Sequence, residues 1–351
     1  MSLRKLTSIL SLAFLAPILP LAAQTPLFTD GLGFGGSKVF SEGRNPLGNP
    51  ARFDQASPGY YFTYVSGDQR AQDNQAYLLD SANANSAALL GLQNSPWAER
   101  ARSYGIAGVK ESAVLAFTHE DLNGMVAFPD VAPADFNSAT NLSTVTGRRA
   151  AVDRLSFGGA SISNGTGMGL NLRVEQWHNG IQTAAIDPAA GQLPWVNLDS
   201  ALLGLSSTTD KTLAVGLDAG FVLQLAQGVR AGIMADQLNS RRLWDVYLQP
   251  QVRAGLQVDL GSSAKISVES DLNAVERMPF PIRQKSSSAS LTLTASQAVA
   301  LVVGVQELTI GTAAVTRVGV TLELKTTAFL LSVGYQFGQE TPLRGGTLMV
   351  N

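Results

Sequence analysis

The sequence of 351 residues contains no cysteine and only two histidines. The lack of cysteine excludes a disulfide-stapled scaffold, a thiolate metal site and a cysteine nucleophile. His119 and His178 are each expected at a strand end, and one histidine beside carboxylates does not make a metal site. No Gly-x-Ser-x-Gly motif is present either. We therefore expect no catalytic residue, no bound metal and no cofactor, and we predict that the protein is not an enzyme.

Charge is also scarce. Charged residues make up 15% of the chain against 45% hydrophobic residues, and the formal net charge is −2. Soluble proteins usually contain about a quarter charged residues. No basic stripe is available to neutralise phosphates, which argues against nucleic acid as a partner. Beyond residue 23, no run approaches the roughly 18 apolar residues that a membrane helix requires.

The N-terminus is typical of an export signal. Arg4 and Lys5 form a basic start, residues 6–21 form an apolar stretch, and Leu21-Ala22-Ala23 offers a plausible cleavage point. We predict a signal peptide at residues 1–23. An exported chain without membrane helices is either free outside the inner membrane or inserted in the outer membrane as a barrel.

From Lys211 to Phe337, apolar and polar residues alternate strictly in paired runs that are separated by short polar turns. Residues 252–259 give one example. The apolar residues Val252, Ala254, Leu256 and Val258 alternate there with the small or polar residues Arg253, Gly255, Gln257 and Asp259. A period of two indicates a β-strand with one face in an apolar medium and the other in a polar one. Small residues and charges of both signs on the polar face are typical of a wet barrel interior, with lipid outside.

The expected strands are joined in pairs by short turns such as Asn164-Gly165, Gln227-Gly228 and residues 261–263. Asn-Gly is a strong hairpin signal. Longer connections, such as 129–147 and 187–209, separate the pairs, and this asymmetry is typical of outer-membrane barrels. At about 9–11 residues per spanning strand, we predict an all-β, antiparallel transmembrane β-barrel of about 14 strands, within a range of about 12 to 16.

The barrel is assigned to residues 58–337. Residues 24–57 are irregular and rich in Gly, Pro and Asn, and we expect them to form an N-terminal plug. Residues 67–103 interrupt the alternation as a helical or loop insertion, with a short helix at Ala82–Leu92. Residues 338–351 are expected to be a polar C-terminal tail.

The polar faces of the strands carry charges of both signs that we expect to face the lumen. They are Arg154, Arg173, Glu175, Asp218, Arg230, Asp236, Arg253, Asp259, Lys265, Glu269, Asp271, Arg317 and Glu323. Such a set forms either a selectivity lining or a structural network of ion pairs. The even mixture of signs favours the structural network, because a charge-selective pore usually presents a ring of one sign.

Before the first strand, Gly33-Phe34-Gly35-Gly36 is followed by Asn45-Pro46 and then by Asn49-Pro50-Ala51. This order resembles the N-terminal signature of FadL-superfamily barrels, where a Gly-Gly segment precedes an Asn-Pro-Ala tripeptide. Proline fixes its own φ and pushes the preceding residue towards extended geometry, which suits entry into a strand. The resemblance implies a plug motif made of Asn45, Pro46, Asn49, Pro50 and Ala51.

The late hairpins at 251–256, 269–273, 316–320 and 333–335 are most similar to those of TraF-like "conjugal transfer" and PorV-like members of the superfamily. The resemblance implies a barrel of roughly 14 strands with an N-terminal hatch in its lumen. FadL proper resembles a passive carrier of hydrophobic molecules that releases them sideways through an opening in the wall. Other relatives act in secretion.

Two features depart from that family pattern. The chain continues past Phe337, whereas barrel proteins usually end on an aromatic residue, so Tyr335 and Phe337 are expected to supply the terminal-strand insertion signal internally. The many inward charges also argue against a hydrophobic path through the lumen like that of FadL.

The leading functional hypothesis is an outer-membrane barrel that passes or binds small hydrophobic solutes. The alternative is a non-transporting barrel that scaffolds or escorts other envelope or secretion proteins, and a third hypothesis is a secreted β-sandwich adhesin. The expected partners are outer-membrane lipid and the barrel-insertion machinery, with a hydrophobic small molecule for the first hypothesis and envelope proteins for the second.

Overall fold

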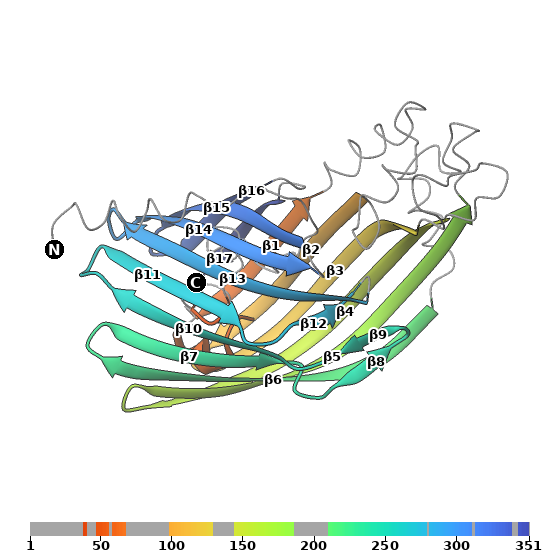
Figure 1. The fold of residues 1–351 in the computed structure, drawn as a ribbon. Helices are drawn as coiled ribbons and strands as arrows, with labels where there is room; N and C mark the ends of the chain where they lie inside the picture. Colours follow the sequence, from red (N-terminus) through yellow and green to blue (C-terminus); the bar gives the residue numbers. More distant parts are fainter. Residues whose placement is uncertain are drawn as a thin grey trace.

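The computed structural model describes residues 38–40, 47–55, 58–67, 98–128, 144–185, 210–278, 281–310, 313–338 and 343–350. Within these residues the chain forms a closed antiparallel barrel of 14 strands (Figure 1). The prediction of an all-β, antiparallel barrel of about 14 strands is therefore confirmed. Among the described residues, no helix has the length and apolar character needed to span a bilayer.

The wall strands follow one another round the ring in chain order. They are β1 (Gly59–Gly67), β2 (Ala98–Lys110), β3 (Ala113–Phe128), β4 (Thr144–Ser163), β5 (Thr166–Ala185), β6 (Asp210–Ala226), β7 (Val229–Asp236), β10 (Gln251–Asp259), β11 (Ala264–Asp271), β13 (Ile282–Thr294), β14 (Val299–Ile310), β15 (Ala313–Lys325), β16 (Phe329–Gly338) and β17 (Leu343–Val350). Pairing of β1 with β17 closes the ring.

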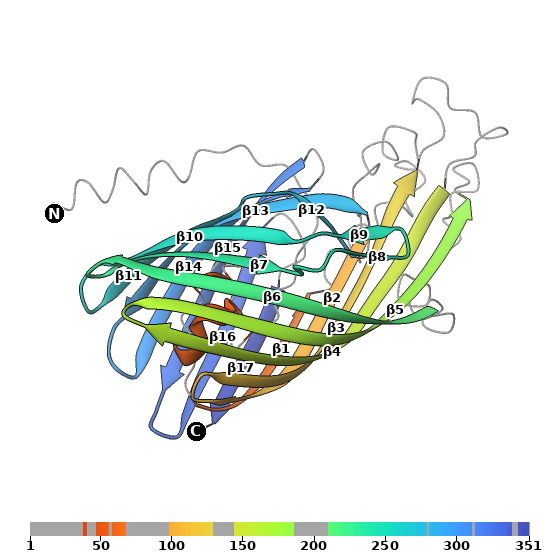
Figure 2. The ribbon, with the colours of Figure 1, turned by 90° about the horizontal axis from the view of Figure 1, so that it is seen from below.

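Four short elements of the described chain are not part of this ring. A hairpin is formed by β8 (Arg241–Leu243) and β9 (Val246–Leu248), and β12 (Val275–Arg277) pairs with the start of β13. The 3-10 helix η1 (Pro50–Gln55) lies within the barrel, where Figure 2 shows it enclosed by the wall strands.

The distribution of polar and apolar side chains is inverted relative to a soluble protein. On β4, Leu155 and Phe157 are exposed while Arg154 and Ser156 are buried, and β5 repeats this pattern. In a soluble protein, large apolar side chains fill the core and charged side chains stay outside. The outer wall therefore suits lipid and the interior is polar. The β-sandwich hypothesis is wrong, because the wall strands form one closed sheet and, within the described residues, no second sheet covers their apolar faces.

The two rims of the barrel differ in their connections. One rim, called the short-turn rim, carries tight turns such as Asn164-Gly165, with φ of 51° and 77°, and Gln227-Gly228, with φ of 74° at the glycine. The left-handed backbone of these turns matches the twist of hairpin strands. The opposite rim, called the long-loop rim, joins β1 to β2 through residues 68–97 and β5 to β6 through 186–209. The short turns expected at these two sites are confirmed.

The expected polar tail at 338–351 is wrong, because Leu343–Val350 forms β17, which pairs with both β1 and β16. Gly345 and Gly346 interrupt the alternation of apolar side chains there, so the sequence pattern hides the strand. Tyr335 and Phe337 consequently lie on the outer face of β16, the strand before the closing one. Their role as an insertion signal stays a prediction.

The expected insertion at 67–103 is wrong at its ends. Gly67 belongs to β1, and β2 begins at Ala98, so residues 98–103 are strand rather than loop. The predicted helix at 82–92 lies outside the described residues. The strands β4 and β5 are also longer than expected, at 20 residues each.

Candidate functional site in the barrel interior

One buried carboxylate holds the N-terminal segment inside the barrel. The backbone N–H groups of Lys38, Val39 and Phe40 all donate to the carboxylate of Glu269 on β11, at N···O distances of 2.9, 3.1 and 2.7 Å. Successive backbone N–H groups that converge in this way form an anion-binding concavity. The anion here is a side chain of the barrel wall, so the segment is anchored by its backbone.

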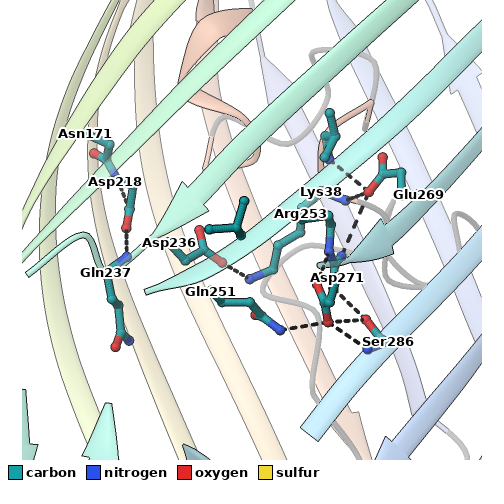
Figure 3. A network of polar contacts seen from close by, with 12 residues as sticks. Lys38, Asn171, Asp218, Asp236, Gln237, Gln251, Arg253, Glu269, Asp271 and Ser286 are labelled. Carbon is teal, nitrogen blue, oxygen red and sulfur yellow. Dashed lines mark hydrogen bonds and ion pairs between the residues drawn. The ribbon is translucent and has the colours of Figure 1, made fainter. Parts of the chain in front are cut away.

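Lys38 adds a second contact to the wall. Its Nζ atom lies 2.8 Å from Oδ2 of Asp236 on β7 (Figure 3). Burial lowers the pKa of the Lys38 ammonium, although the Asp236 carboxylate opposes this shift. The ion pair thus joins the N-terminal segment to the end of β7 nearest the long-loop rim.

The tripeptide Asn49-Pro50-Ala51 rests on glycines of the wall. A Cβ atom at Gly167 would lie 2.7 Å from the Ala51 carbonyl oxygen, and Cβ atoms at Gly169 and Gly220 would overlap Pro50 and Asn49. Gly169 and Gly220 are paired across β5 and β6. The backbone of the tripeptide therefore approaches the sheet at a place where only glycine leaves room.

Asn49 also joins the two described pieces of the N-terminal segment. Its backbone N–H donates to the Lys38 carbonyl at 3.0 Å, and its Oδ1 accepts from the Ala51 N–H at 3.0 Å. The second bond is a local side-chain turn of the kind that Asn favours. Of the residues expected in the plug motif, Asn49, Pro50 and Ala51 are placed inside the barrel, whereas Asn45 and Pro46 lie outside the described residues.

A small apolar cluster fills the space between this segment and the wall. It consists of Val39, Phe40, Ala51, Val222 and Met234, all of them buried. The Phe40 ring fits over two glycines, since Cβ atoms at Gly232 and Gly255 would lie 3.1 Å from its ring atoms. The sequence gives no direct signal for this cluster, because inward glycines and valines read as ordinary lumen residues.

The predicted lumen charges form two groups of ion pairs. In the first, Arg154 on β4 bonds Glu120 at 3.1 Å and Glu175 at 2.8 Å. Arg173 on β5 then lies 3.5 Å from Glu175 and 2.8 Å from Asp218. The charges thus alternate in sign across β3 to β6, and each carboxylate has a cationic neighbour. Glu120 is a member that the sequence analysis missed.

The second group surrounds Asp271 on β11. Arg253 donates to Asp271 at 2.7 Å, and Gln251 donates to it at the same distance (Figure 3). The Ser286 backbone N–H and hydroxyl donate to the same carboxylate. Arg253 also lies 3.9 Å from Glu269, so this group continues into the anchor of the N-terminal segment.

The remaining predicted charges lie elsewhere on the wall. Arg230 pairs with Asp259 at 3.5 Å near the short-turn rim, Lys265 is half-buried on β11, and Arg317 and Glu323 are buried on β15. The structure brings together opposite charges rather than a ring of one sign. This arrangement favours the structural network over a charge-selective lining.

The hairpin β8–β9 folds into the barrel near the long-loop rim. Arg148 on β4 donates to Asp245 in the hairpin turn, with an Nη1–Oδ2 distance of 2.9 Å, and Arg241 pairs with Glu175. The sequence pattern predicted no hairpin at residues 241–248. Apolar side chains seal the hairpin against the wall, and they are Ala150, Val152, Trp177, Leu243, Val246, Leu248 and Met278.

The Asp245 carboxyl is sensitive to this contact. Burial would raise its pKa, but the hydrogen bond and positive charge of Arg148 outweigh burial and lower the pKa below its ordinary value. The ionised form is therefore the one that the hairpin favours.

Strands β6 and β7 are paired over only part of the length of β6. Their pairing ends at Ala219 and Ala235, although β6 extends to Asp210. Between that point and the long-loop rim, the Leu238 N–H donates to the Leu217 carbonyl at 2.7 Å, and the Leu217 N–H donates to Asn239 Oδ1 at 3.0 Å. This stretch of the β6 edge is thus covered by irregular chain rather than by a neighbouring wall strand.

Comparison with known proteins gives a likeness of fold. No protein-family model matches the chain, and no curated protein matches it. Among solved structures, a CymD monoaromatic hydrocarbon channel matches with a TM-score of 0.56 and 12% identity, covering 93% of this chain and 97% of that one.

Two toluene transporters match in the same way. The Ralstonia pickettii TbuX structure has a TM-score of 0.53 and 11% identity, covering 94% of this chain and 97% of that one. The Pseudomonas putida TodX structure has a TM-score of 0.54 and 9% identity, covering 95% and 98%. At such identities the likeness shows the barrel fold over nearly the whole chain.

Proposed function

We propose that this protein is an outer-membrane channel of the FadL type that passes small hydrophobic solutes, with residues 24–57 as a removable plug. The observation that carries the proposal is the anchoring of Lys38–Phe40 by Glu269 inside the barrel. Noncovalent contacts, among them these hydrogen bonds and the ion pair of Lys38 with Asp236, hold this segment, so it can leave without breaking covalent bonds. Full-length similarity in fold to channels described as carrying monoaromatic hydrocarbons and toluene supports the solute class.

The membrane location follows from the outer wall. Exposed leucines, valines and aromatic residues surround the barrel, and such a surface is stable only in lipid. An even-stranded antiparallel barrel of this kind is typical of the outer membrane, which supports the location that we propose. The predicted signal peptide at residues 1–23 would provide export, and the barrel-insertion machinery is the partner that we propose for insertion.

The parted edge of β6 is the proposed exit from the lumen into the bilayer. Leu213 and Val215 of this edge are 72% and 49% exposed, while the neighbouring strands β7, β10 and β11 contain only 8, 9 and 8 residues. A hydrophobic solute that leaves here would meet lipid without crossing the charged rim. Displacement of Leu238 and Asn239 from β6 would widen this exit.

The competing function is a barrel that scaffolds or escorts envelope proteins, as the TraF-like and PorV-like resemblance suggests. The observation that favours it is the paired charge of the interior together with the inward hairpin, since both fill the lumen. A scaffold does not require its plug to move, whereas a channel does.

Liposome swelling and planar-bilayer conductance separate the two functions. Full-length protein and a variant lacking residues 24–57 would be compared, with toluene and a sugar of similar size as solutes. Conductance only in the deleted form, together with faster toluene than sugar entry, supports the channel. A lack of entry in both forms, with loss of envelope proteins on deletion in cells, supports the scaffold.

Glu269→Gln refines this test without removing any chain. It weakens the anchor of Lys38–Phe40, whereas Glu323→Gln changes another buried glutamate on the far wall strand β15 and serves as the matched control. A channel opens more often in the first variant than in the second.

A further inference from the structure

The outer wall carries a hollow that no part of the proposed passage uses. It lies across β15, β16, β17 and β1, has a volume of about 650 Å³, and is lined mainly by apolar groups, among them Tyr64, Leu322, Val333 and Gly346. These side chains belong to the lipid-facing set, as Tyr64 and Val333 are 52% and 55% exposed. The hollow is therefore open to the membrane and not to the lumen.

The hollow exists because β17 has glycine at an outward position. Gly346 pairs with Tyr64 on β1 and with Val333 on β16, so the side chains on either side have no neighbour between them. A Cβ atom at Gly346 would meet only the Ser332 carbonyl oxygen, at 3.7 Å. Larger side chains would therefore fill the hollow without a clash, unlike the glycines that seat the N-terminal segment.

One arginine, Arg344, lies at the end of this hollow that is nearest the long-loop rim. Arg344 lies two residues along β17 from Gly346, on the same outward face, between Ser66 and Tyr335. The interior arginines Arg154 and Arg253 pair with carboxylates. Arg344 is exposed and has no ion pair within the part of the chain that the structure describes.

The level of Arg344 coincides with the edge of the apolar band. Ser66 pairs with Arg344 on one side and with Arg102 on the other, so the outward row is polar across β2, β1 and β17. The next outward row towards the short-turn rim contains Tyr64 and Tyr104, which are paired. Tyrosine is enriched at headgroup level in barrels, and the long loops lie outside the cell. Arg344 thus sits at the outer-leaflet boundary.

We propose that this hollow binds one phosphorylated membrane lipid of net negative charge, with an acyl chain against Gly346 and the headgroup phosphate on Arg344. A guanidinium matches phosphate oxygens with paired hydrogen bonds and keeps its charge at every relevant pH. The acyl chain makes van der Waals contacts with Val333, Leu322 and the Tyr64 ring. Without a bound chain, these side chains lack such contacts on the side that faces the hollow. The charge and the hollow together distinguish this site from the rest of the lipid-facing wall.

The test is native mass spectrometry of the full-length protein released from detergent with added lipid. Phosphatidylglycerol and phosphatidylcholine with identical acyl chains are compared, because they differ in net headgroup charge. We expect phosphatidylglycerol to be retained preferentially, and Arg344→Gln to lower its retention about fivefold, the effect of one basic residue on an anionic lipid. Gly346→Leu should lower retention of both lipids.

Matched controls lie on other parts of the outer wall. Arg283→Gln removes an exposed arginine of β13, and Gly159→Leu adds a side chain at a β4 glycine that has open space around it. Both controls should bind lipid as the unchanged protein does. Heat-modifiable migration in gels verifies that each barrel is folded, and Gly346→Ala replaces Gly346→Leu if the larger side chain prevents folding.

Three results would overturn the proposal. The first is equal retention of the two lipids by the unchanged protein, and the second is unchanged phosphatidylglycerol retention in Arg344→Gln. The third is displacement of phosphatidylglycerol by inorganic phosphate at equal concentration, because the site would then recognise the anion without its acyl chain.

Discussion

Replacing Glu269 by glutamine should release the N-terminal segment from the barrel wall. The carboxylate accepts three backbone N–H bonds, from Lys38, Val39 and Phe40, at 2.9, 3.1 and 2.7 Å. Glutamine keeps one carbonyl acceptor but presents an NH₂ group, itself a donor, to the remaining N–H groups. The substitution therefore removes the charge and leaves buried donors without an acceptor.

The expected magnitude follows from these bonds. Hydrogen bonds to a charged group contribute about 1.5–3 kcal/mol each, and bonds to one acceptor do not add fully. We expect the free energy that holds the segment in place to fall by about 3 kcal/mol, which corresponds to about a 150-fold larger open fraction. The ion pair of Arg253 with Asp271, at 2.7 Å, should keep the wall itself intact.

Hydrogen–deuterium exchange of the protein in lipid nanodiscs measures this change directly. The peptide that contains residues 38–40 should exchange about 150-fold faster in Glu269→Gln, while peptides from β14 and β15 should not change. Glu323→Gln is the control, because it removes another buried carboxylate that is on β15 rather than on β11. An exchange rate at residues 38–40 that rises no more in Glu269→Gln than in Glu323→Gln would refute the assigned anchor.

Three further outcomes follow from the same structure. Gly169→Val should displace the Pro50 carbonyl and raise solute entry into liposomes, whereas Gly159→Val, on the open outer face, should leave entry unchanged. Because the contact with Arg148 lowers the pKa of Asp245, the stability that this contact gives the β8–β9 hairpin is fully present above the ordinary aspartate pKa of about 3.9 and is lost as the pH falls through the lowered pKa. Hydrogen exchange of the hairpin amides should therefore accelerate only in that acidic range. Asp245→Asn should abolish this pH dependence. Removal of residues 343–350 should leave β1 and β16 each without one of their two partner strands and abolish heat-modifiable migration in gels. A folded barrel without β17 would contradict the closure described above.

The alternation of side chains predicted the wall because it is a local property. Each outward leucine or valine and each inward arginine or glutamate follows from its neighbour by the two-residue period of a strand. Most of the thirteen predicted lumen charges occupy buried positions for this reason, Arg154, Glu175 and Asp271 among them. Their partners depend on how distant strands are aligned, so the period gives the face and not the ion pair.

The elements that the sequence analysis missed lack that local signal. In β17, Gly345 and Gly346 carry no side chain that would show the two-residue period, and the strand reads as a polar tail although it closes the ring. The hairpin β8–β9 is only three residues per strand, too short for a period to show. Its position is set by Arg148 and Glu175, which are far away in the chain.

Glycine has opposite effects on the two faces of the wall, and position alone distinguishes them. Gly169 is inward, and the Pro50 carbonyl occupies the space that a side chain would take there. Any larger residue at this position therefore competes with the plug. Gly346 is outward, and its missing side chain leaves a hollow that any larger residue would fill. Both positions are neutral in hydropathy, so a pattern of apolar and polar residues carries no information about either. The register of the strands, which places one against the plug and the other against lipid, therefore determines where this barrel binds its own chain and where it can bind another molecule.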